Sequence, residues 1–200
     1  ALLMLQKYVK LKPGDWVMQN AANSGVGTDV IKLARKLDLH TVNVVRRKEL
    51  IKPLHDMGAN VVVLEGPDLA ERIALATNGA EIKLGLDAVA GSAVQAMAES
   101  LASGGTIVNY GLLSGDPCVI DPHQVVFRDI TLTGFWLAKL MRGMSGKKIR
   151  ELYEELSGYF LDGTLKVAVE ARYGLDDIQK AMAHAKREGR GGKVLLRPNG

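Results

Sequence analysis

The stretch WVMQNAANSGVG, residues 16–27, decides the fold that this sequence predicts. It begins as an apolar run of strand length and ends in Gly25 and Gly27, which allow a sharp turn and a close approach of the backbone to a ligand. Behind the turn, apolar residues recur on one face of a helix: Val26, Val30, Ile31, Ala34 and Leu37. A buried strand, a glycine turn and a helix in this order are typical of the first unit of a Rossmann fold, which binds a dinucleotide.

The glycine turn would hold a pyrophosphate through the unpaired N–H groups and the positive dipole end of the following helix. The complete G-x-G-x-x-G spacing is missing, however, and glycine pairs also occur in ordinary strand-to-helix turns. Ser24 is not a hydrolase nucleophile, because no G-x-S-x-G motif surrounds it. The turn alone therefore leaves a phosphate site and a purely structural turn both open.

Three consecutive basic residues, Arg46, Arg47 and Lys48, follow the predicted second strand at residues 41–45. This position contacts the adenosine ribose in Rossmann folds, where an acid binds a free 2′-hydroxyl and a guanidinium pairs with a 2′-phosphate. The alternative, a solvated helix start, is disfavoured because cations destabilise a helix N-terminus. We therefore predict that the chain binds NADPH rather than NADH. A Rossmann methyltransferase, which generally has an acid here, is also disfavoured.

Strands and helices alternate along the rest of the chain. Further strands are predicted at residues 60–64, 84–89, 106–110 and 130–137, and helices at residues 2–9, 48–57, 68–77, 92–101 and 147–161. Six strands joined by crossover helices predict an α/β fold, a doubly wound parallel Rossmann sheet with its ligand site at the carboxyl ends of the strands. The predicted extended segment 166–173, helix 175–186 and strand 193–197 do not extend this sheet. We therefore expect a Rossmann domain at residues 1–163 and part of a second domain at residues 164–200.

The composition limits the classes of protein to which the chain can belong. Of its 200 residues 47% are hydrophobic, which is enough for one large core. The net charge of +4 does not predict a nucleic-acid partner, because the bases between residues 139 and 150 are spaced as on a solvated helix face. The single cysteine, Cys118, excludes an internal disulfide and a cysteine-rich zinc site. The sequence has no apolar stretch of about 18 residues and no signal-like segment, so we expect neither a membrane span nor a targeting segment.

Candidate catalytic residues are scarce. The four histidines, at positions 40, 55, 123 and 184, lie far apart in the sequence with no partnered carboxylate, so we predict neither a catalytic residue nor a metal site. Asp87, inside a predicted strand, is either a buried, hydrogen-bonded acid or a group near the cofactor, and the first interpretation is favoured. Phe135 and Trp136 lie near the end of the sixth strand, where they either close the core or wall an apolar pocket.

Four motifs resemble, in this order, those of the medium-chain dehydrogenase/reductase superfamily: LKPGDWVMQNAANSGVG (residues 11–27), NVVRRK (43–48), GTIVNYGLLSG (105–115) and ITLTGFWL (130–137). Within the superfamily, the sequence is most similar to the trans-2-enoyl-CoA reductases of mitochondrial type. The resemblance implies an NADPH-dependent oxidoreductase of fatty acid metabolism that reduces the 2,3-double bond of an enoyl thioester carried by CoA or acyl carrier protein. An NADPH quinone or enone oxidoreductase of the same superfamily and a non-catalytic NADPH-binding module are the alternatives.

The same resemblance implies which residues bind NADPH. The turn after the first strand would hold the pyrophosphate, the basic residues the 2′-phosphate, and the loop after the fifth strand the nicotinamide ribose. The end of the sixth strand would line the nicotinamide and acyl pocket, and a late lysine would approach the cofactor. The predicted cofactor-binding residues are Asn23, Ser24, Gly25, Val26, Gly27, Arg46, Arg47, Lys48, Tyr110, Gly111, Leu112, Leu113, Phe135, Trp136, Leu137 and Lys193. The position of Arg47 is often acidic in relatives, so its side chain is the one expected to point elsewhere.

The resemblance also implies what accompanies this chain. Enoyl reductases of this kind begin with a GroES-like catalytic domain that supplies a proton-donating tyrosine, and none of it precedes Ala1. We therefore expect residues 164–200 to be the C-terminal return into that domain, and the chain alone to bind NADPH without efficient turnover. The sixth strand would pair with its copy in a homodimer. The protein would work in the cytoplasm of a bacterium or in the mitochondrion of a eukaryote.

Overall fold

The computed structural model of the protein describes residues 1–187 and 189–198. The chain forms two compact units, Ala1–Glu154 and Glu155–Gly200, and the limit between them falls inside helix α8 (Gly146–Leu161). In the described part, no helix is long and apolar enough to cross a membrane. The predicted division into a Rossmann domain at residues 1–163 and part of a second domain at residues 164–200 stays a prediction.

The first unit contains a six-stranded parallel sheet with the strand order β3-β2-β1-β4-β5-β6. Its strands are β1 (Trp16–Gln19), β2 (His40–Val45), β3 (Val61–Leu64), β4 (Ile82–Asp87), β5 (Thr106–Asn109) and β6 (Thr131–Gly134). This is the order of the Rossmann fold, and the direction of winding reverses between β1 and β4. The predicted doubly wound α/β fold is therefore confirmed.

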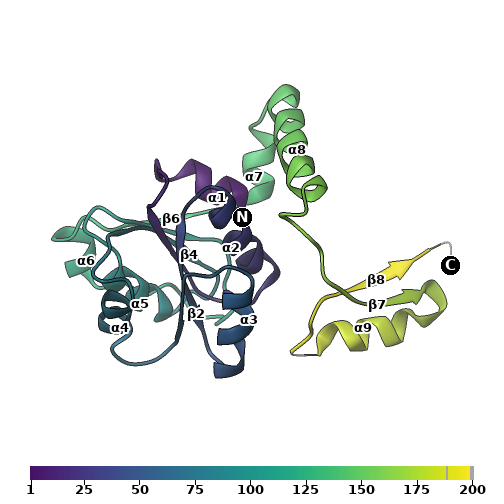
Figure 1. Ribbon diagram of the computed structural model, residues 1–200, viewed down its shortest axis with the longest axis horizontal. Coiled ribbons are helices and arrows are strands. Elements are labelled where there is room, and N and C mark those ends of the chain that lie inside the picture. Colours follow the sequence, from purple (N-terminus) through teal and green to yellow (C-terminus); the bar gives the residue numbers. More distant parts are fainter. Residues whose placement is uncertain (188, 199–200) are drawn as a thin grey trace. The chain divides into compact units, whose positions relative to one another are not determined.

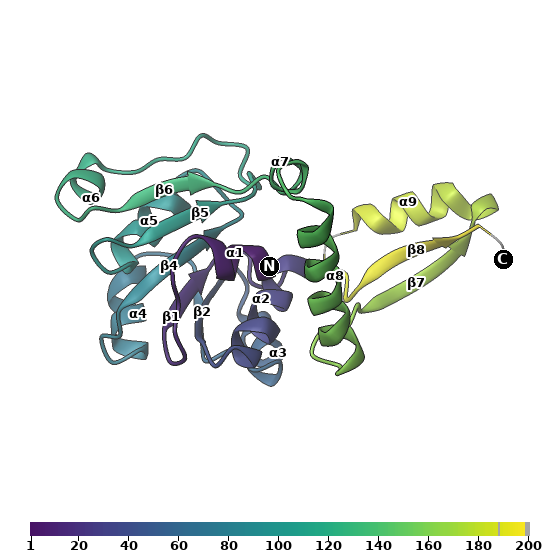
Figure 2. The ribbon, with the colours of Figure 1, turned by 90° about the horizontal axis from the view of Figure 1, so that it is seen from above.

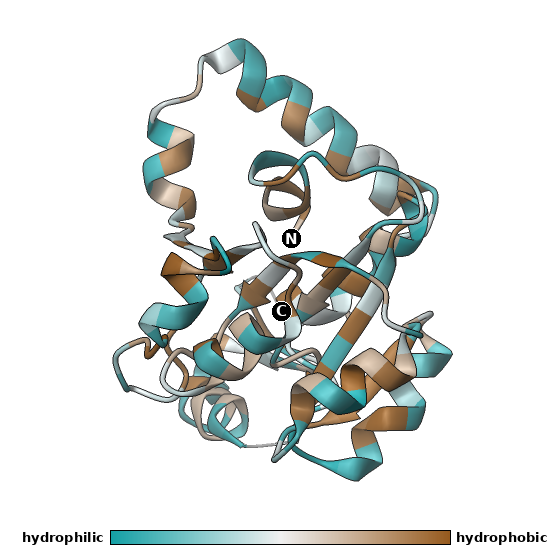
Figure 3. Ribbon diagram, turned by 90° about the vertical axis from the view of Figure 1, so that its left-hand side faces the viewer, coloured by the Kyte–Doolittle hydropathy of each residue, from teal (hydrophilic) through white to brown (hydrophobic). Residues whose placement is uncertain are grey.

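Helices cover both faces of this sheet. Figure 1 shows α4 (Leu69–Ala76) and α5 (Ala93–Ser100) on one side of the strands and α2 (Gly25–Lys36) and α3 (Ile51–Asp56) on the other. The first pair packs around Ile73 and Met97, the second around Ile31 and Leu54. Because each helix buries only one face, hydrophobic and hydrophilic residues alternate along the helices in Figure 3. The central strands are buried on both faces, which explains the apolar, β-branched run of β2.

Three short helical elements correspond to the predicted helices at residues 2–9 and 48–57. Helix α1 (Leu2–Lys7) precedes β1, as predicted. The predicted helix at residues 48–57 divides into a 3-10 turn, η1 (Lys48–Leu50), and α3. Pro53 lies in the first turn of α3, where an N–H group would have no helical acceptor, so the helix tolerates it without a break.

Two helices are missing from the sequence prediction. The first is α6 (Pro122–Val126), which begins with a capping pair: the Asp121 carboxylate accepts a hydrogen bond from the N–H of His123 at 2.7 Å, and proline takes the first turn. An aspartate followed by a proline is a known helix start, so the sequence did contain this signal.

The second missing helix is α7 (Leu137–Arg142). The predicted strand at residues 130–137 was too long, since β6 ends at Gly134 and Trp136 is already the N-cap of α7. The bases between residues 139 and 150 therefore lie on two helices, α7 and α8, and not on one helix face as predicted.

The second unit is a small β-α-β arrangement. Its strands β7 (Val169–Gly174) and β8 (Lys193–Arg197) pair in parallel in a separate two-stranded sheet. The 3-10 turn η2 (Leu175–Asp177) and α9 (Ile178–Lys186) connect them, and Figure 2 shows α9 running along the two strands. As predicted, this segment does not extend the six-stranded sheet.

Candidate functional site

The carboxyl edge of the six-stranded sheet gathers most of the residues predicted to bind a cofactor. Because the strands are parallel, the segments that follow β1, β2, β5 and β6 all leave the sheet at this edge. The structure thus places residues 23–27, 46–48, 110–113 and 135 along one edge, with Trp136 and Leu137 at the start of α7. Lys193 is the first residue of β8 in the second unit, so its predicted approach to the cofactor stays a prediction.

The turn between β1 and α2 offers free N–H groups. Ser24 is the N-cap of α2, and its Oγ accepts a hydrogen bond from the N–H of Gly27 at 3.0 Å. Within the described residues, the N–H groups of Gly25 and Val26 have no acceptor. They stand at the positive end of a helix of 12 residues, an arrangement that favours an anion such as a phosphate.

Gly27 allows α2 to begin directly against the end of β1. A Cβ at this position would lie 2.6 Å from the carbonyl oxygen of Ala22, which is far too close for any side chain. Ala22 is itself fully buried, so its backbone cannot move aside without disturbing the core. The second glycine of the motif is therefore required for packing, independently of any ligand.

The basic residues after β2 are exposed, and two of them are available to an anion. Arg47 forms an ion pair with Glu49, with 3.5 Å between Nε and Oε1. Arg46 and Lys48 form no ion pair with any residue that the structure describes. Their side chains follow the buried Val45, so they project beyond the sheet edge into solvent. This arrangement fits a phosphate better than a structural role within the chain.

The loop after β5 contains a buried hydroxyl group that lacks a partner. The Oη of Tyr110 is inaccessible to solvent and forms no hydrogen bond with the described part of the protein. Burial raises the pKa of Tyr110, and the nearby Ser24 hydroxyl lowers it in part without reaching hydrogen-bond geometry. An unpaired buried hydroxyl costs free energy, so this loop carries a polar group whose hydrogen bond is not made by the described residues.

The neighbouring Gly111 holds this loop against the end of β4. A Cβ at Gly111 would lie 2.7 Å from the carbonyl oxygen of Ala88, so the close approach of the two loops requires glycine. Leu112 and Leu113 follow, and each residue is 71% exposed. The loop thus presents one buried polar group and two exposed apolar groups at the sheet edge.

The two aromatic residues after β6 differ in their surroundings. Trp136 is 64% exposed, with the guanidinium of Arg142 lying 5.3 Å from its ring centroid, so the interpretation that it closes the core is wrong. Phe135 is half-buried, and its N–H donates to the carbonyl oxygen of Asn109. The other interpretation, that the two residues wall an apolar pocket, stays a prediction.

Asp87 is fully buried and hydrogen-bonded, as the favoured interpretation predicted. It is the last residue of β4, so its carboxylate lies beneath the same sheet edge.

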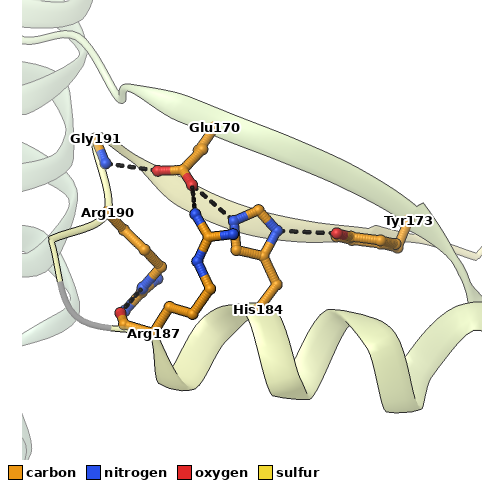
Figure 4. Close-up of polar contacts among 6 residues, drawn as sticks. All are labelled: Glu170, Tyr173, His184, Arg187, Arg190 and Gly191. Carbon is orange, nitrogen blue, oxygen red and sulfur yellow. Dashed lines mark hydrogen bonds and ion pairs between the residues drawn. The ribbon is translucent and has the colours of Figure 1, made fainter.

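The prediction that no histidine has a carboxylate partner was wrong for His184. Its Nε2 lies 2.6 Å from Oε1 of Glu170, and its Nδ1 lies 2.9 Å from Oη of Tyr173 (Figure 4). The N–H of Gly191 donates to the other carboxylate oxygen of Glu170 at 2.5 Å. This cluster joins β7, α9 and the loop before β8. Because the partners are 14 and 11 positions apart on a strand and a helix, no spacing rule reveals them.

The other histidines make local contacts. The rings of His40 and Trp16 lie 4.9 Å apart, Nδ1 of His55 contacts the carbonyl oxygen of Ala59 at 2.9 Å, and the His123 ring packs against Phe127. No group of three or more histidine, cysteine, aspartate or glutamate side chains in the described ranges could hold a metal ion.

Comparison with known proteins identifies the family. The sheet order and the capped glycine turn define the class, an α/β protein with a Rossmann sheet. Residues 25–157 match the zinc-binding dehydrogenase family, so the chain belongs to that family. Its relatives place it in the medium-chain dehydrogenase/reductase superfamily, close to the enoyl reductases. The described residues do not form a zinc site by themselves.

Three similar proteins illustrate this placement. The mitochondrial enoyl-acyl-carrier-protein reductase of Caenorhabditis elegans is 36% identical over 187 residues, which cover 91% of this chain and 53% of that protein. An Etr1p mutant in complex with NADP and crotonyl-CoA aligns with a TM-score of 0.85 at 25% identity, covering 98% of this chain and 57% of that one. A mycobacterial quinone oxidoreductase aligns with a TM-score of 0.89 at 28% identity, covering 98% and 60%. The chain spans about half the length of the curated relatives that it matches.

The pKa of Glu170 is expected to lie below the ordinary glutamate value of 4.5, because hydrogen bonds from His184 and from the N–H of Gly191 stabilise the carboxylate. A lowered pKa in the folded state means that this stabilisation is present above pH 4.5 and is lost as the pH falls through the lowered pKa. A side-chain NMR titration of Glu170 measures the shift directly. The variant His184→Ala should move the pKa back towards the ordinary value, whereas His123→Ala, in the other unit, should leave it unchanged. A Glu170 pKa at or above the ordinary value would contradict the described cluster.

Proposed function

We propose that the chain is the NADPH-binding part of a reductase that acts on the 2,3-double bond of enoyl thioesters in fatty acid metabolism. One observation supports the choice of cofactor: Arg46 and Lys48, which form no ion pair with the described residues, are exposed at the sheet edge where two N–H groups of α2 lack an acceptor among those residues. These are the two positions at which a Rossmann fold holds a 2′-phosphate and a pyrophosphate. The enoyl thioester is supported by the similarity to the C. elegans reductase and to the Etr1p mutant with NADP and crotonyl-CoA.

Each part of the edge has a role in the proposed complex. The N–H groups of Gly25 and Val26 bind the pyrophosphate, in the turn formed by Asn23, Ser24 and Gly27. Arg46 would pair with the 2′-phosphate and Lys48 would add a second positive charge, whereas Arg47 is turned towards Glu49. Tyr110 and residues 111–113 border the nicotinamide half.

The reductive chemistry comes from the cofactor and the acyl pocket. When bound, NADPH supplies a hydride for the β-carbon of the enoyl thioester, whose α-carbon takes up a proton. Phe135, Trp136 and Leu137 line the pocket and exclude water from the nicotinamide and the acyl chain. We assign the proton donor to the remainder of the full-length protein, into which residues 164–200 return, and Lys193 to a contact with the cofactor. The relatives' names support a mitochondrial location if the protein is eukaryotic, and we propose the cytoplasm if it is bacterial.

Removal of one phosphate contact tests the choice of cofactor. The variant Arg46→Ala should weaken NADPH binding by about tenfold to a hundredfold, because a charge-assisted pair with the 2′-phosphate is lost. The affinity for NADH, which lacks this phosphate, should change by less than about twofold. Isothermal titration calorimetry with both dinucleotides measures the two effects.

The matched control is Lys12→Ala, which removes the same charge from an exposed residue before β1, at the opposite edge of the sheet. It should leave both affinities unchanged. A wild-type chain that prefers NADH, or that binds S-adenosylmethionine and no dinucleotide, would overturn the proposed cofactor.

Turnover assays test the proposed reaction. The chain alone, mixed with NADPH and crotonyl-CoA, should show no oxidation of NADPH at rates usual for enzymes, on the order of 1–1000 per second. A full-length protein that includes these residues should reduce crotonyl-CoA. The similarity to the mycobacterial quinone oxidoreductase makes a quinone the alternative substrate, and a preference for it would replace the enoyl thioester in our proposal. Binding of NADPH without any turnover would indicate a non-catalytic module.

We also propose that β6 pairs with its copy in a homodimer. The N–H groups of Thr131 and Phe135 donate to the carbonyl oxygens of Gly105 and Asn109, so those of Leu132 and Gly134 face away from β5. An edge strand with outward N–H groups is a template for pairing with a second chain.

The variant Leu132→Pro should convert the dimer into a monomer in sedimentation equilibrium, because proline removes an outward N–H group and leaves the bonds to β5 intact. Leu132→Val keeps this N–H group and should remain dimeric. A wild-type chain that is monomeric at high concentration would rule out the proposed pairing.

A further inference from the structure

The carboxylate of Asp87 is a point at which three strand ends meet. It accepts hydrogen bonds from Asn20 Nδ2 at 2.5 Å, from Asn109 Nδ2 at 2.6 Å, and from the N–H groups of Val89 at 3.0 Å and Ala90 at 3.1 Å. Asn20 follows β1, Asn109 ends β5, and Asp87 ends β4. The three side chains therefore link neighbouring strands at the carboxyl edge of the sheet.

In the described part of the chain, no cation balances this carboxylate. Asp87 is fully buried, and no lysine or arginine in residues 1–187 or 189–198 forms an ion pair with it. A buried carboxylate without hydrogen bonds is strongly unfavourable, so its burial depends on the four N–H donors around it. Each donor is held in place in return. The arrangement is therefore rigid only while all three strand ends keep their relative positions.

The side chains of Asn20 and Asn109 connect Asp87 to the turn after β1 and to the loop after β5. Asn20 Oδ1 accepts a hydrogen bond from the N–H of Ala88 at 2.8 Å, which fixes the residue that opens the turn before α2. On the other side, Asn109 Nδ2 also donates to the carbonyl oxygen of Gly111 at 2.8 Å, and the N–H of Tyr110 donates to the backbone oxygen of Asp87 at 2.8 Å. One carboxylate thus ties the turn after β1 to the loop after β5.

We infer that Asp87 is a positioning residue that sets the relative placement of the pyrophosphate turn and the nicotinamide loop. The inference rests on the proposed function, because it assigns those two segments to the two halves of NADPH. Asp87 is too deeply buried to touch the cofactor. It acts through Asn20 and Asn109, and its effect is confined to ligands that span both loops.

The sign of the effect separates this role from simple electrostatics. Neutralising a buried negative charge beside a phosphate site would tighten the binding of an anion if charge alone mattered. Loss of the geometric link has the opposite effect, since a dinucleotide can no longer meet both loops at once. The affinity of a ligand that binds only the basic residues after β2 should not depend on the placement of either loop.

The test compares two ligands on the variant Asp87→Asn of the 200-residue chain. The new amide nitrogen faces N–H donors in either orientation. At least one hydrogen bond to the side chain of residue 87 is therefore replaced by a repulsive contact. The Kd for NADPH should rise at least about tenfold. The Kd for adenosine 2′-monophosphate, which carries only the phosphate assigned to Arg46 and Lys48, should change by less than about twofold. Both are measured by calorimetry, directly or by competition.

Two further variants keep the outcome interpretable. Asn109→Ala removes only the link to the loop after β5 and should show the same selectivity with a smaller rise, even if Asp87→Asn fails to fold. Ile73→Val removes one methylene group from the core beside α4 and leaves the hydrogen bonds of Asp87 in place. It should leave both dissociation constants unchanged. Two outcomes would overturn the positioning role alone. One is an equal loss of affinity for both ligands, and the other is an unchanged Kd for NADPH in Asp87→Asn and Asn109→Ala. A wild-type chain that binds no NADPH would overturn the proposed function as well.

Discussion

The close contact between Gly27 and Ala22 is the constraint on which the candidate site depends. With no side chain at Gly27, the backbone of α2 passes where a Cβ would lie 2.6 Å from the carbonyl oxygen of Ala22. The helix can therefore start directly beyond β1 and present its free N–H groups at the sheet edge. Gln19 holds the same junction from within the sheet, since its amide donates to the carbonyl oxygen of Gly27 at 2.9 Å and to Oδ1 of Asn43 at 2.8 Å. Strand β1, strand β2 and helix α2 thus meet in one buried polar contact.

Buried polar side chains lie beneath this edge, next to the two hydrophobic layers of the unit. Gln19, Asn20, Asn43 and Asp87 are all buried, and the side chain of each forms a hydrogen bond with a neighbouring strand or the residue that follows it. A buried polar group without a partner costs about 1–3 kcal/mol, so such groups favour one arrangement over its neighbours. An apolar core alone would pack the strands but would not fix the loops that follow them. The hydrophobic layers therefore determine the sheet, and the polar groups determine its binding edge.

The sequence predicted what depends on local pattern and missed what depends on distant partners. The six strands and the glycine turn follow from apolar runs and from Gly25 and Gly27, because periodicity and backbone freedom act within a few residues. The end of β6 was misplaced because Phe135, Trp136 and Leu137 look equally suited to a strand and to the start of α7. The partners of Asp87 and His184 come from other elements and could not be inferred from spacing. These two polar clusters, one in each unit, are therefore what only a structure can show.

The two ends of the candidate site differ in what they require from the chain. The end that we propose for the phosphates consists of backbone N–H groups and exposed bases, which are in place as soon as β1, α2 and β2 have formed. The other end presents Leu112, Leu113 and Trp136, all more than half exposed, around the buried hydroxyl of Tyr110. Exposed apolar groups around a few polar ones are typical of a ligand pocket, and leaving them in water is unfavourable. The exposed apolar groups therefore fit the proposed pocket, whereas the proposed phosphate contacts need only the segments that follow β1 and β2.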